Sequence, residues 1–245
     1  MKKIFICGHR GFPAKYPQNT LPSFAGAIEV GCDRIEYDLH WTADRRLVVC
    51  HNATVDATSN GTGNIADMTF DEIRKLDFGS WKDERFANTP IPEFRELLEL
   101  TTSRNPQLFH LVELKVDSVE YTEAVLRELA EFNMDGHFTL VSFHLDMLRE
   151  IKKRHPEVMI HGNPRTAIKE FDYEEYRIFN SVGIRKDNAT AEVIAGFHSV
   201  DTQVDVWPVD TAEEFFTHVA DGADSFTSND PETLIAARAK LSAQA

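Results

Sequence analysis

The sequence predicts an α/β protein, because strand-like and helix-like segments alternate along most of its 245 residues. Short apolar runs rich in β-branched residues are separated by segments with the 3.6-residue spacing of amphipathic helices. Repeats of strand, helix and strand form parallel sheets. Eight such units in about 250 residues are typical of a closed barrel, so we expect a (β/α)8 barrel, the TIM-barrel architecture. An open doubly wound sheet is the competing fold, but no G-x-G-x-x-G follows the first strand.

The expected elements follow one another in order along the chain. Strands are expected at 3–8, 34–40, 47–51, 108–115, 138–143, 158–162, 178–184, 203–209 and 224–228. Helices are expected at 20–30, 93–104, 119–133, 145–155, 189–198, 211–221 and 231–242. Several of these helices have recognisable starts, such as Ser118, Thr211 with Glu214 three residues later, and Asp230 followed by a proline.

One region interrupts the alternation. Residues 52–92, from NATVDATSNGTGNI to NTPIP, are rich in turn formers and contain one short helical piece near 69–76. We therefore expect an insertion that caps one end of the barrel, within a single domain that covers residues 1–245.

Composition and charge exclude several classes of partner. The chain has 40 acidic and 26 basic side chains, a formal charge of −14, which repels nucleic acid and anionic membranes. Cys7, Cys32 and Cys50 show no C-x-x-C spacing and favour buried free thiols in a reducing compartment. The sequence has no apolar run of signal-peptide or transmembrane length. These features predict a cytoplasmic protein without membrane insertion.

Three acidic side chains are expected at one end of the barrel. Glu36 and Asp38 are two residues apart near the end of the strand 34–40, so the alternation of side chains places both on one face. Glu113 lies near the end of the strand 108–115. Converging carboxylates repel one another unless a cation holds them, and oxygen ligands suit a hard ion. The sequence therefore predicts one divalent cation, Mg²⁺ or Ca²⁺.

Histidines and basic residues are expected at the same end. His9 and Arg10 follow the first strand, His51 closes LVVCH, and Lys115 comes two residues after Glu113. Because histidine titrates near neutral pH, His9 and His51 are candidates for acid and base in breaking a phosphoester bond. Arg10 and Lys115 can neutralise a phosphate oxygen or brace the carboxylates. The residues alone predict a metal-assisted enzyme for a phosphate ester or a carbonyl compound.

Two further side chains stand at strand ends. Trp207 ends the strand before Thr211, where it can contact a ligand or only pack. His161 also ends an expected strand, but Gly162 and Pro164 beside it indicate loop geometry, so His161 is left out of the predicted site.

The stretch GHRG…PQNTLPSFAGAIEVGCDRIEYDLHWTADRRLVVCHN resembles the opening of the glycerophosphodiester phosphodiesterase family. The family pattern is HRG, PENT, a helix ending in G-x-D, then I-E-x-D, T-x-D and L-V-V-x-H-D. SNGTG and IP…LLEL resemble its inserted subdomain, VELK its third metal-binding strand, VWPVDTAEE its tryptophan-bearing strand seven, and GADSFTSNDPE its closing segment. The resemblance spans essentially the whole chain.

This resemblance implies hydrolysis of glycerophosphodiesters to sn-glycerol 3-phosphate and an alcohol. It also implies roles for the residues singled out above. These are His9 and His51 as acid and base, Glu36, Asp38 and Glu113 as ligands of the divalent cation, and Arg10 and Lys115 as phosphate contacts. Trp207 is a further candidate for substrate binding. The expected partner is a small-molecule substrate, and the chain can be a monomer or a homodimer.

Three positions depart from the family pattern. Gln18 stands in place of the glutamate of PENT, Asn52 in place of the aspartate after the second histidine, and Ala57 in place of an arginine. The first two each remove a negative charge and the third removes a positive one. Two alternatives therefore stay open: a phosphodiesterase for another polyol or sugar phosphodiester, and a barrel that binds a phosphodiester without hydrolysing it.

Overall fold

The protein, described here as a computed structural model, is a closed barrel. Residues 3–164 and 170–243 are described, so both ends of the expected 1–245 domain and residues 165–169 lie outside the description. Within the described ranges, eight parallel strands form the ring: β1 (Phe5–His9), β2 (Arg34–Trp41), β4 (Phe109–Leu114), β5 (Phe138–Ser142), β6 (Ile160–Gly162), β7 (Ser181–Arg185), β8 (Gln203–Trp207) and β9 (Ser225–Ser228). β1 pairs with β2 on one side and with β9 on the other, which closes the ring. The predicted (β/α)8 barrel is confirmed.

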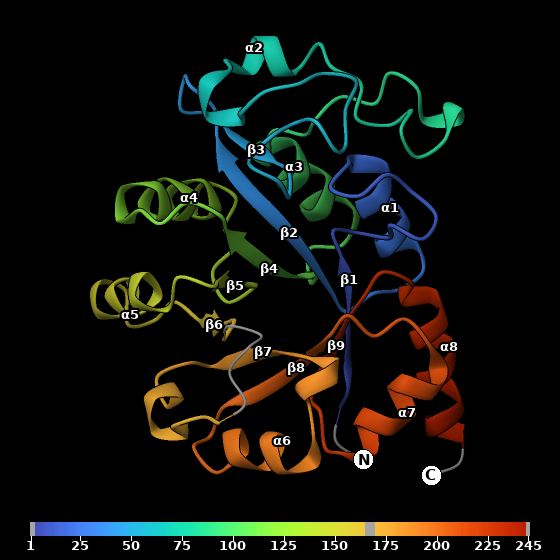
Figure 1. Ribbon diagram of the computed structural model, residues 1–245, viewed down its shortest axis with the longest axis vertical. Helices are drawn as coiled ribbons and strands as arrows, with labels where there is room; N and C mark the ends of the chain where they lie inside the picture. Colours follow the sequence, from blue (N-terminus) through green and yellow to red (C-terminus); the bar gives the residue numbers. More distant parts are fainter. Residues whose placement is uncertain (1–2, 165–169, 244–245) are drawn as a thin grey trace.

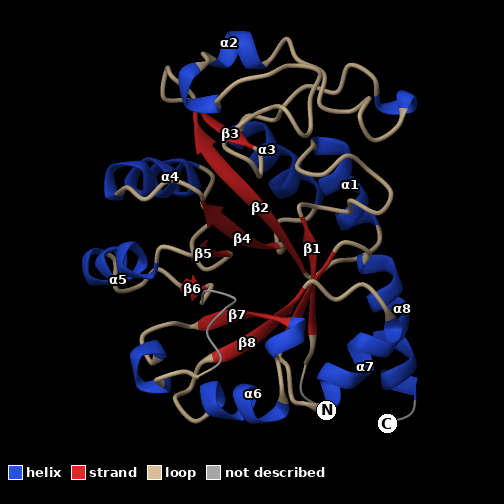
Figure 2. Ribbon diagram, viewed as in Figure 1, coloured by secondary structure: helices blue, strands red, loops and turns tan. Residues whose placement is uncertain are grey.

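Helices surround the strands, as the blue ribbons around the red arrows show (Figure 2). They are α1 (Leu21–Glu29), α3 (Phe94–Arg104), α4 (Val119–Glu131), α5 (Leu145–Arg154), α6 (Ala191–His198), α7 (Ala212–Ala220) and α8 (Pro231–Ala243). Ser118 accepts a hydrogen bond from the N–H of Tyr121 and Thr211 from that of Glu214, as expected for these caps. After β6 the described residues contain a 3₁₀ helix, Tyr173–Tyr176, in place of an α-helix, and another, Lys186–Asn188, follows β7. In the part of the chain that the structure describes, every helix is too short or too polar to cross a membrane.

One predicted strand lies outside the ring. β3 (Leu47–Val49) pairs antiparallel with the far end of β2, with Leu39 opposite Val49. It therefore runs back toward the mouth of the barrel, and the N–H of Cys50 donates to the carbonyl of Asp38 at 3.0 Å. This return brings His51 to the end of the barrel where β1 delivers His9.

Side chains of the strands alternate between the helix layer and the barrel interior, as predicted for β2. Tyr37 is fully buried on the outer side, where its ring packs against Phe24 of α1 and Phe94 of α3. Glu36 and Asp38 point to the inside. Below them, Cys7, Leu111 and Val141 form a small apolar cluster within the barrel. The interior beneath the carboxylates is therefore mixed, because this apolar cluster lies beside the buried polar side chains of Asp205 and Ser225. Cys7, Cys32 and Cys50 are buried and unbridged.

The segment between β3 and α3 lies beyond the end of β2, at the top of the view in Figure 1. It contains the 3₁₀ helices Ile65–Asp67 and Glu84–Phe86 and one short helix, α2 (Phe70–Ile73), at the place predicted for a helical piece. Its apolar side chains pack in a cluster of their own, together with two residues of the β3 region. The cluster consists of Val48, Cys50, Val55, Ile65, Ile73, Phe78 and Ile91.

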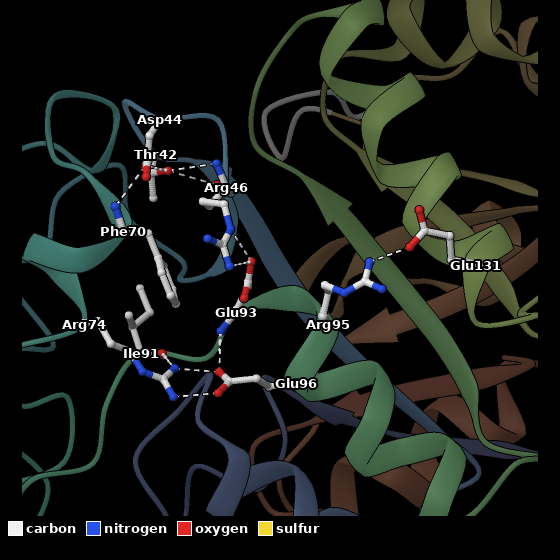
Figure 3. Close-up of polar contacts among 10 residues, drawn as sticks. All are labelled: Thr42, Asp44, Arg46, Phe70, Arg74, Ile91, Glu93, Arg95, Glu96 and Glu131. Atoms are coloured by element: carbon white, nitrogen blue, oxygen red, sulfur yellow. Dashed lines mark hydrogen bonds and ion pairs between the residues drawn. The ribbon is translucent and has the colours of Figure 1, made fainter.

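Two arginines tie this segment to the start of α3 (Figure 3). Arg46, from the β2–β3 turn, donates through Nε to Oε1 of Glu93 at 2.5 Å. Arg74, at the end of α2, donates to both carboxylate oxygens of Glu96, at 2.5 and 2.6 Å. Glu96 also accepts the N–H of Glu93 at 2.9 Å and so caps α3. One carboxylate therefore stabilises the helix start and holds the inserted segment against it.

Candidate active site

A cavity opens at the carboxyl ends of the barrel strands. This is the end at which (β/α)8 barrels carry their chemistry. The predicted residues that line it are His9, Arg10, Glu36, His51, Glu113, Lys115 and Trp207. Asp38 is fully buried beside Arg10 and Lys115, so the structure brings all the predicted site residues together.

The three carboxylates form one buried cluster. Glu36, Asp38 and Glu113 each offer an oxygen within 4.8 Å of the others. Burial raises the pKa of Glu36, and the charges of Asp38 and Glu113 raise it further. Burial and Asp38 likewise raise the pKa of Glu113. Without a further positive charge, this cluster therefore disfavours full ionisation.

The cluster fits a divalent cation. Oε1 of Glu36 is buried, and no described residue donates a hydrogen bond to it. Two positive side chains, Arg10 and Lys115, face the three carboxylates, which leaves one net negative charge when all are ionised. Carboxylate oxygens are the ligands that Mg²⁺ and Ca²⁺ prefer, so this set of donors suits such an ion.

Lys115 and Arg10 keep Asp38 ionised. Nζ of Lys115 lies 2.8 Å from Oδ1 of Asp38 and also pairs with Glu113, while Nε of Arg10 lies 3.5 Å from Oδ2 of Asp38. Burial alone would raise the pKa of Asp38, but the two cations outweigh it and bring this pKa to about 2. In the same way, burial opposes the charge of Lys115, but Asp38 and Glu113 raise its pKa above the ordinary value.

Arg10 is placed by its backbone as well as by its side chain. Its φ of 56° is uncommon for a residue other than glycine. In this conformation its N–H donates to Oε2 of Glu36 at 2.9 Å. Its Nη1 donates to Oε1 of Gln18 at 3.0 Å. The loop after β1 thus fixes the arginine against both the cluster and the next turn.

Each histidine has one ring nitrogen held by an asparagine. Nδ1 of His9 lies 2.8 Å from Oδ1 of Asn229, and Nδ1 of His51 lies 2.7 Å from Oδ1 of Asn52. An amide oxygen only accepts, so Nδ1 carries the proton and Nε2 is the free nitrogen in both rings. Nε2 of His9 lies 3.9 Å from Oε2 of Glu36. Burial and Arg10 lower the pKa of His9 to about 4, and burial also lowers the pKa of His51.

Two of the three departures from the family pattern contact the site. Gln18 accepts from Arg10, where a glutamate would add a charge, and Asn52 accepts from His51. Ala57 is exposed and stands in the inserted segment. The substituted residues keep an acceptor oxygen at the first two places, so the positions of Arg10 and His51 are maintained without the negative charges.

The cavity wall also contains four polar residues that were not predicted from the sequence: His161, Asn163, Asp205 and Thr227. His161 lies within β6, not in a loop, and points into the cavity. The alternation that placed Glu36 and Asp38 also applies here, because His161 and Asn163 are two apart, as are Asp205 and Trp207. Asn229, which holds His9, is likewise two residues beyond Thr227. Alternation across the last residues of every strand was the available signal.

The model of the glycerophosphoryl diester phosphodiesterase family matches residues 9–233, a range that contains both histidines and all three carboxylates. The chain belongs to this family. The match confirms the predicted family, and with it the prediction that the chain is an enzyme of the phosphodiester hydrolase class.

Relatives within the family cover nearly the whole chain. A glycerophosphodiester phosphodiesterase of Caldanaerobacter subterraneus subsp. tengcongensis is 32% identical over 237 residues, which are 95% of this chain and 97% of the relative. A solved structure of a family protein from Galdieria sulphuraria has a TM-score of 0.87 at 24% identity and covers 96% of this chain and 97% of its own. An Oleispira antarctica phosphodiesterase in complex with sn-glycerol-3-phosphate has a TM-score of 0.84 at 21% identity, with 96% of each chain covered. The two structures share the fold.

Proposed function

We propose that the protein hydrolyses glycerophosphodiesters to sn-glycerol 3-phosphate and an alcohol, with a divalent cation and two histidines at the reacting group. The observation that carries the proposal is the meeting of His9, His51 and the three-carboxylate cluster in one cavity. The relative from Caldanaerobacter is named for this activity, and the Oleispira phosphodiesterase was solved with sn-glycerol-3-phosphate. Both agree with the proposed reaction.

Glu36, Asp38 and Glu113 would hold the cation, Mg²⁺ or Ca²⁺. When bound, such an ion supplies Lewis-acid polarisation of a phosphate oxygen. Three carboxylates with Arg10 and Lys115 carry one net negative charge, and a bound divalent ion would change this to one net positive charge. A phosphodiester carries one negative charge, so the loaded site would match its substrate in charge.

His9 and His51 would move the protons. Each presents a free Nε2 at the cavity while an asparagine fixes its Nδ1–H. One ring can then accept a proton from the nucleophile, and the other, once protonated, can give a proton to the leaving alcohol oxygen. The two roles are interchangeable, because both rings are held in the same tautomer.

Arg10, Lys115 and Trp207 would bind the substrate. Arg10 and Lys115 bring positive charge to the cavity wall, where a phosphate oxygen can pair with them. Trp207 lines the same cavity and makes an edge-to-face contact with the ring of Phe143, with centroids 6.3 Å apart and planes at 84°. This aromatic pair gives one side of the mouth an apolar surface.

The test is release of glycerol 3-phosphate from glycerophosphocholine, glycerophosphoethanolamine and glycerophosphoglycerol, with chelator, Mg²⁺ or Ca²⁺ in parallel. His9→Ala and His51→Ala should each lower kcat at least about a hundredfold, because each removes a proton-transfer group. His137→Ala is the matched control, since His137 lies outside the cavity between α4 and β5. Circular dichroism would verify that all three variants are folded.

Different results point to different functions. Wild-type turnover by folded His9→Ala or His51→Ala would contradict the role given to that residue. Hydrolysis of only another polyol or sugar phosphodiester would favour the first alternative, and tight binding without any product would favour the non-catalytic barrel. The cytoplasmic location and a homodimer stay predictions of the sequence.

A further inference from the structure

The wall of the cavity opposite the carboxylates carries a second group of polar atoms. The ring order is β1-β2-β4-β5-β6-β7-β8-β9, so β7 lies four strands from β2 in either direction. Gly183 of β7 is thus on the strand across the barrel from Glu36 and Asp38. A substrate that spans the cavity from the carboxylates would reach this wall with its other end.

Three polar atoms, two from the end of β6 and one from β8, converge over Gly183. A methyl group on this glycine would lie 2.1 Å from Oδ1 of Asn163, 2.8 Å from Nε2 of His161 and 3.1 Å from Nε1 of Trp207. Those distances leave no room for a larger residue, so glycine is what allows the Asn163 amide to lie against β7. The three side chains all line the cavity.

Two of these atoms are open to a further partner. Nε1 of Trp207 is buried, and no described residue makes a hydrogen bond with it. Oδ1 of Asn163 is buried beside the ring of His161, which bonds to this amide, and its second lone pair stays free. Asn163 itself is 6% exposed. An unpaired buried polar atom is costly, so an acceptor and a donor left together at a cavity wall point to a ligand that satisfies both.

The group is uncharged. Nδ1 of His161 lies 2.8 Å from Oγ of Ser181, which leaves Nε2 toward Gly183. Burial and Arg34 lower the pKa of His161 to about 3, so the ring is neutral. Neither asparagine nor tryptophan carries a charge. The neighbouring Asp205 accepts from Oγ of Ser225 at 2.5 Å, and burial raises its pKa to about 6.

We propose that His161, Asn163 and Trp207 form a subsite for a hydroxyl group of the leaving alcohol. The preferred substrates are therefore diesters whose second alcohol is a polyol, such as a second glycerol or an inositol. The inference builds on the proposed function, in which the carboxylate side of the cavity takes the glycerol phosphate. A hydroxyl donates to the free lone pair of Oδ1 of Asn163 and accepts from the N–H of Trp207, so it completes the hydrogen bonding of both atoms.

A choline ester is the strongest competing substrate. Its quaternary ammonium group can neither donate nor accept a hydrogen bond, so it would leave the N–H of Trp207 unpaired and Oδ1 of Asn163 without a second hydrogen bond. It would instead need the faces of Trp207 and Phe143 at the mouth. A polyol diester therefore tests the hydrogen-bonding wall of the cavity, and the choline diester tests the aromatic wall.

The experiment compares kcat/KM for glycerophosphoglycerol, glycerophosphoinositol and glycerophosphocholine. The wild-type protein should prefer both polyol diesters over the choline diester by roughly tenfold or more, since a site built for a hydroxyl discriminates against a group that lacks one. Asn163→Leu removes the acceptor and keeps the number and branching of the heavy atoms, and Gly183→Ala displaces it without changing a polar residue. Each should lower the ratio of polyol to choline kcat/KM by roughly tenfold.

Gly162→Ala on β6 is the matched control. Its methyl group would meet Leu145 and Phe179 at 3.0 Å in the apolar layer behind the strand, so the ratio should stay at the wild-type value. An unchanged ratio in both Asn163→Leu and Gly183→Ala, or a wild-type preference for the choline diester, would overturn the subsite. Failure of the wild-type protein to hydrolyse any of the three diesters would instead overturn the proposed function, and the subsite would fall with it.

Discussion

The side chain of Asn229 decides which nitrogen of His9 faces the cavity. Its Oδ1 holds Nδ1 of His9, while its Nδ2 donates to Oδ2 of Asp210 at 2.8 Å and its N–H to Oδ1 at 2.6 Å. Asp210 therefore fixes the amide, and the amide fixes the imidazole. Asn229 is a positioning residue for His9.

Asn229→Ala should therefore lower kcat about 10- to 100-fold, the usual effect of removing the partner of an oriented histidine. KM should change little, because no substrate contact is removed. Steady-state kinetics measure kcat and KM separately. Asn64→Ala, at an exposed position of the inserted segment, is the control. A folded Asn229→Ala protein with wild-type kcat would show that His9 needs no such support.

Asp205 makes a separate contribution at the residue scale, to stability as a function of pH. It is 3% exposed, and burial raises its pKa to about 6 although Ser225 donates to it. In the unfolded chain an aspartate titrates near 3.9, so from about pH 4 to 6 the native state binds more protons than the unfolded state. Stability from this group is present at low pH and is lost as the pH rises, by about 3 kcal/mol in total.

Asp205→Asn should remove this loss. Urea unfolding at pH 4.5 and pH 7 would give the free energy of unfolding for both proteins, and the difference between wild type and variant should shift in favour of the variant as the pH rises. Other groups, such as Asp38 with its lowered pKa, change stability with pH in the opposite direction. Their contributions are the same in both proteins and cancel in the comparison. A constant difference between the two pH values would mean that Asp205 titrates normally.

The sequence could predict the residues near the first motifs but not those of the opposite wall. Glu36 and Asp38 follow from alternation because β2 is eight residues long and its pattern is clear. β6 has only three residues, and the glycine and proline around His161 indicate a loop. What keeps His161 in a strand is pairing with β5 and β7. Such tertiary pairing is invisible to local composition.

At the scale of elements, the start of α3 joins the inserted segment to the barrel. The same Glu96 carboxylate caps the helix and takes both hydrogen bonds from Arg74 (Figure 3). On the other side of the segment, Nζ of Lys82 donates to the carbonyl of Pro13 at 2.7 Å, and the rings of Phe86 and Tyr16 lie 5.7 Å apart. We propose that residues 52–92 are a cap within a single domain, fastened both to α3 and to the loop after His9.

Glu96→Ala should lower the free energy of unfolding by about 2 kcal/mol, because it removes a helix cap and a bidentate ion pair together. Arg95→Ala is the matched control on the same helix, since its pair with Glu131 is exposed and should contribute at most about 0.5 kcal/mol. Unfolding should remain one transition, followed both by the fluorescence of Trp81 in a background with Trp41 and Trp207 replaced by phenylalanine and by circular dichroism of the barrel. Two separate transitions would contradict the single domain, and equal losses in the two variants would contradict the role of Glu96.

The direction of a strand was beyond the sequence. The run 47–51 has the composition of a strand, and the structure confirms it as β3, yet periodicity carries no information on whether a strand joins the ring or runs back along its neighbour. Its antiparallel pairing with β2 is what delivers His51 to the cavity. The motif predicted that His51 belongs to the site; only the tertiary fold shows the path by which it arrives.

At the scale of the whole molecule, the parallel ring could be predicted because its signal is repeated in every strand and helix. Because parallel strands end on the same side, the ring also determines where acidic residues of this chain, whose formal charge is −14, come close together. Most acidic residues are solvent-accessible, where water weakens their repulsion, but strand ends from β2 and β4 concentrate three carboxylates in a buried place. Folding itself therefore brings like charges together in the site, and a bound cation would relieve their repulsion.

Addition of Mg²⁺ or Ca²⁺ should consequently raise the melting temperature, and a chelator should reverse the change. Binding to the folded state alone stabilises it by about 2.7 kcal/mol when the ion is at 100 times its Kd. Because the pKa values of Glu36 and Glu113 are raised, binding must release protons, so the shift should shrink as the pH falls from 7 to 5. Glu113→Gln should lose most of the shift, whereas Glu84→Gln, at an exposed position of the inserted segment, should keep it. An equal shift in both variants would mean that the ions only screen the surface charge, and the larger of the Mg²⁺ and Ca²⁺ shifts at equal concentration would identify the ion that the three carboxylates prefer.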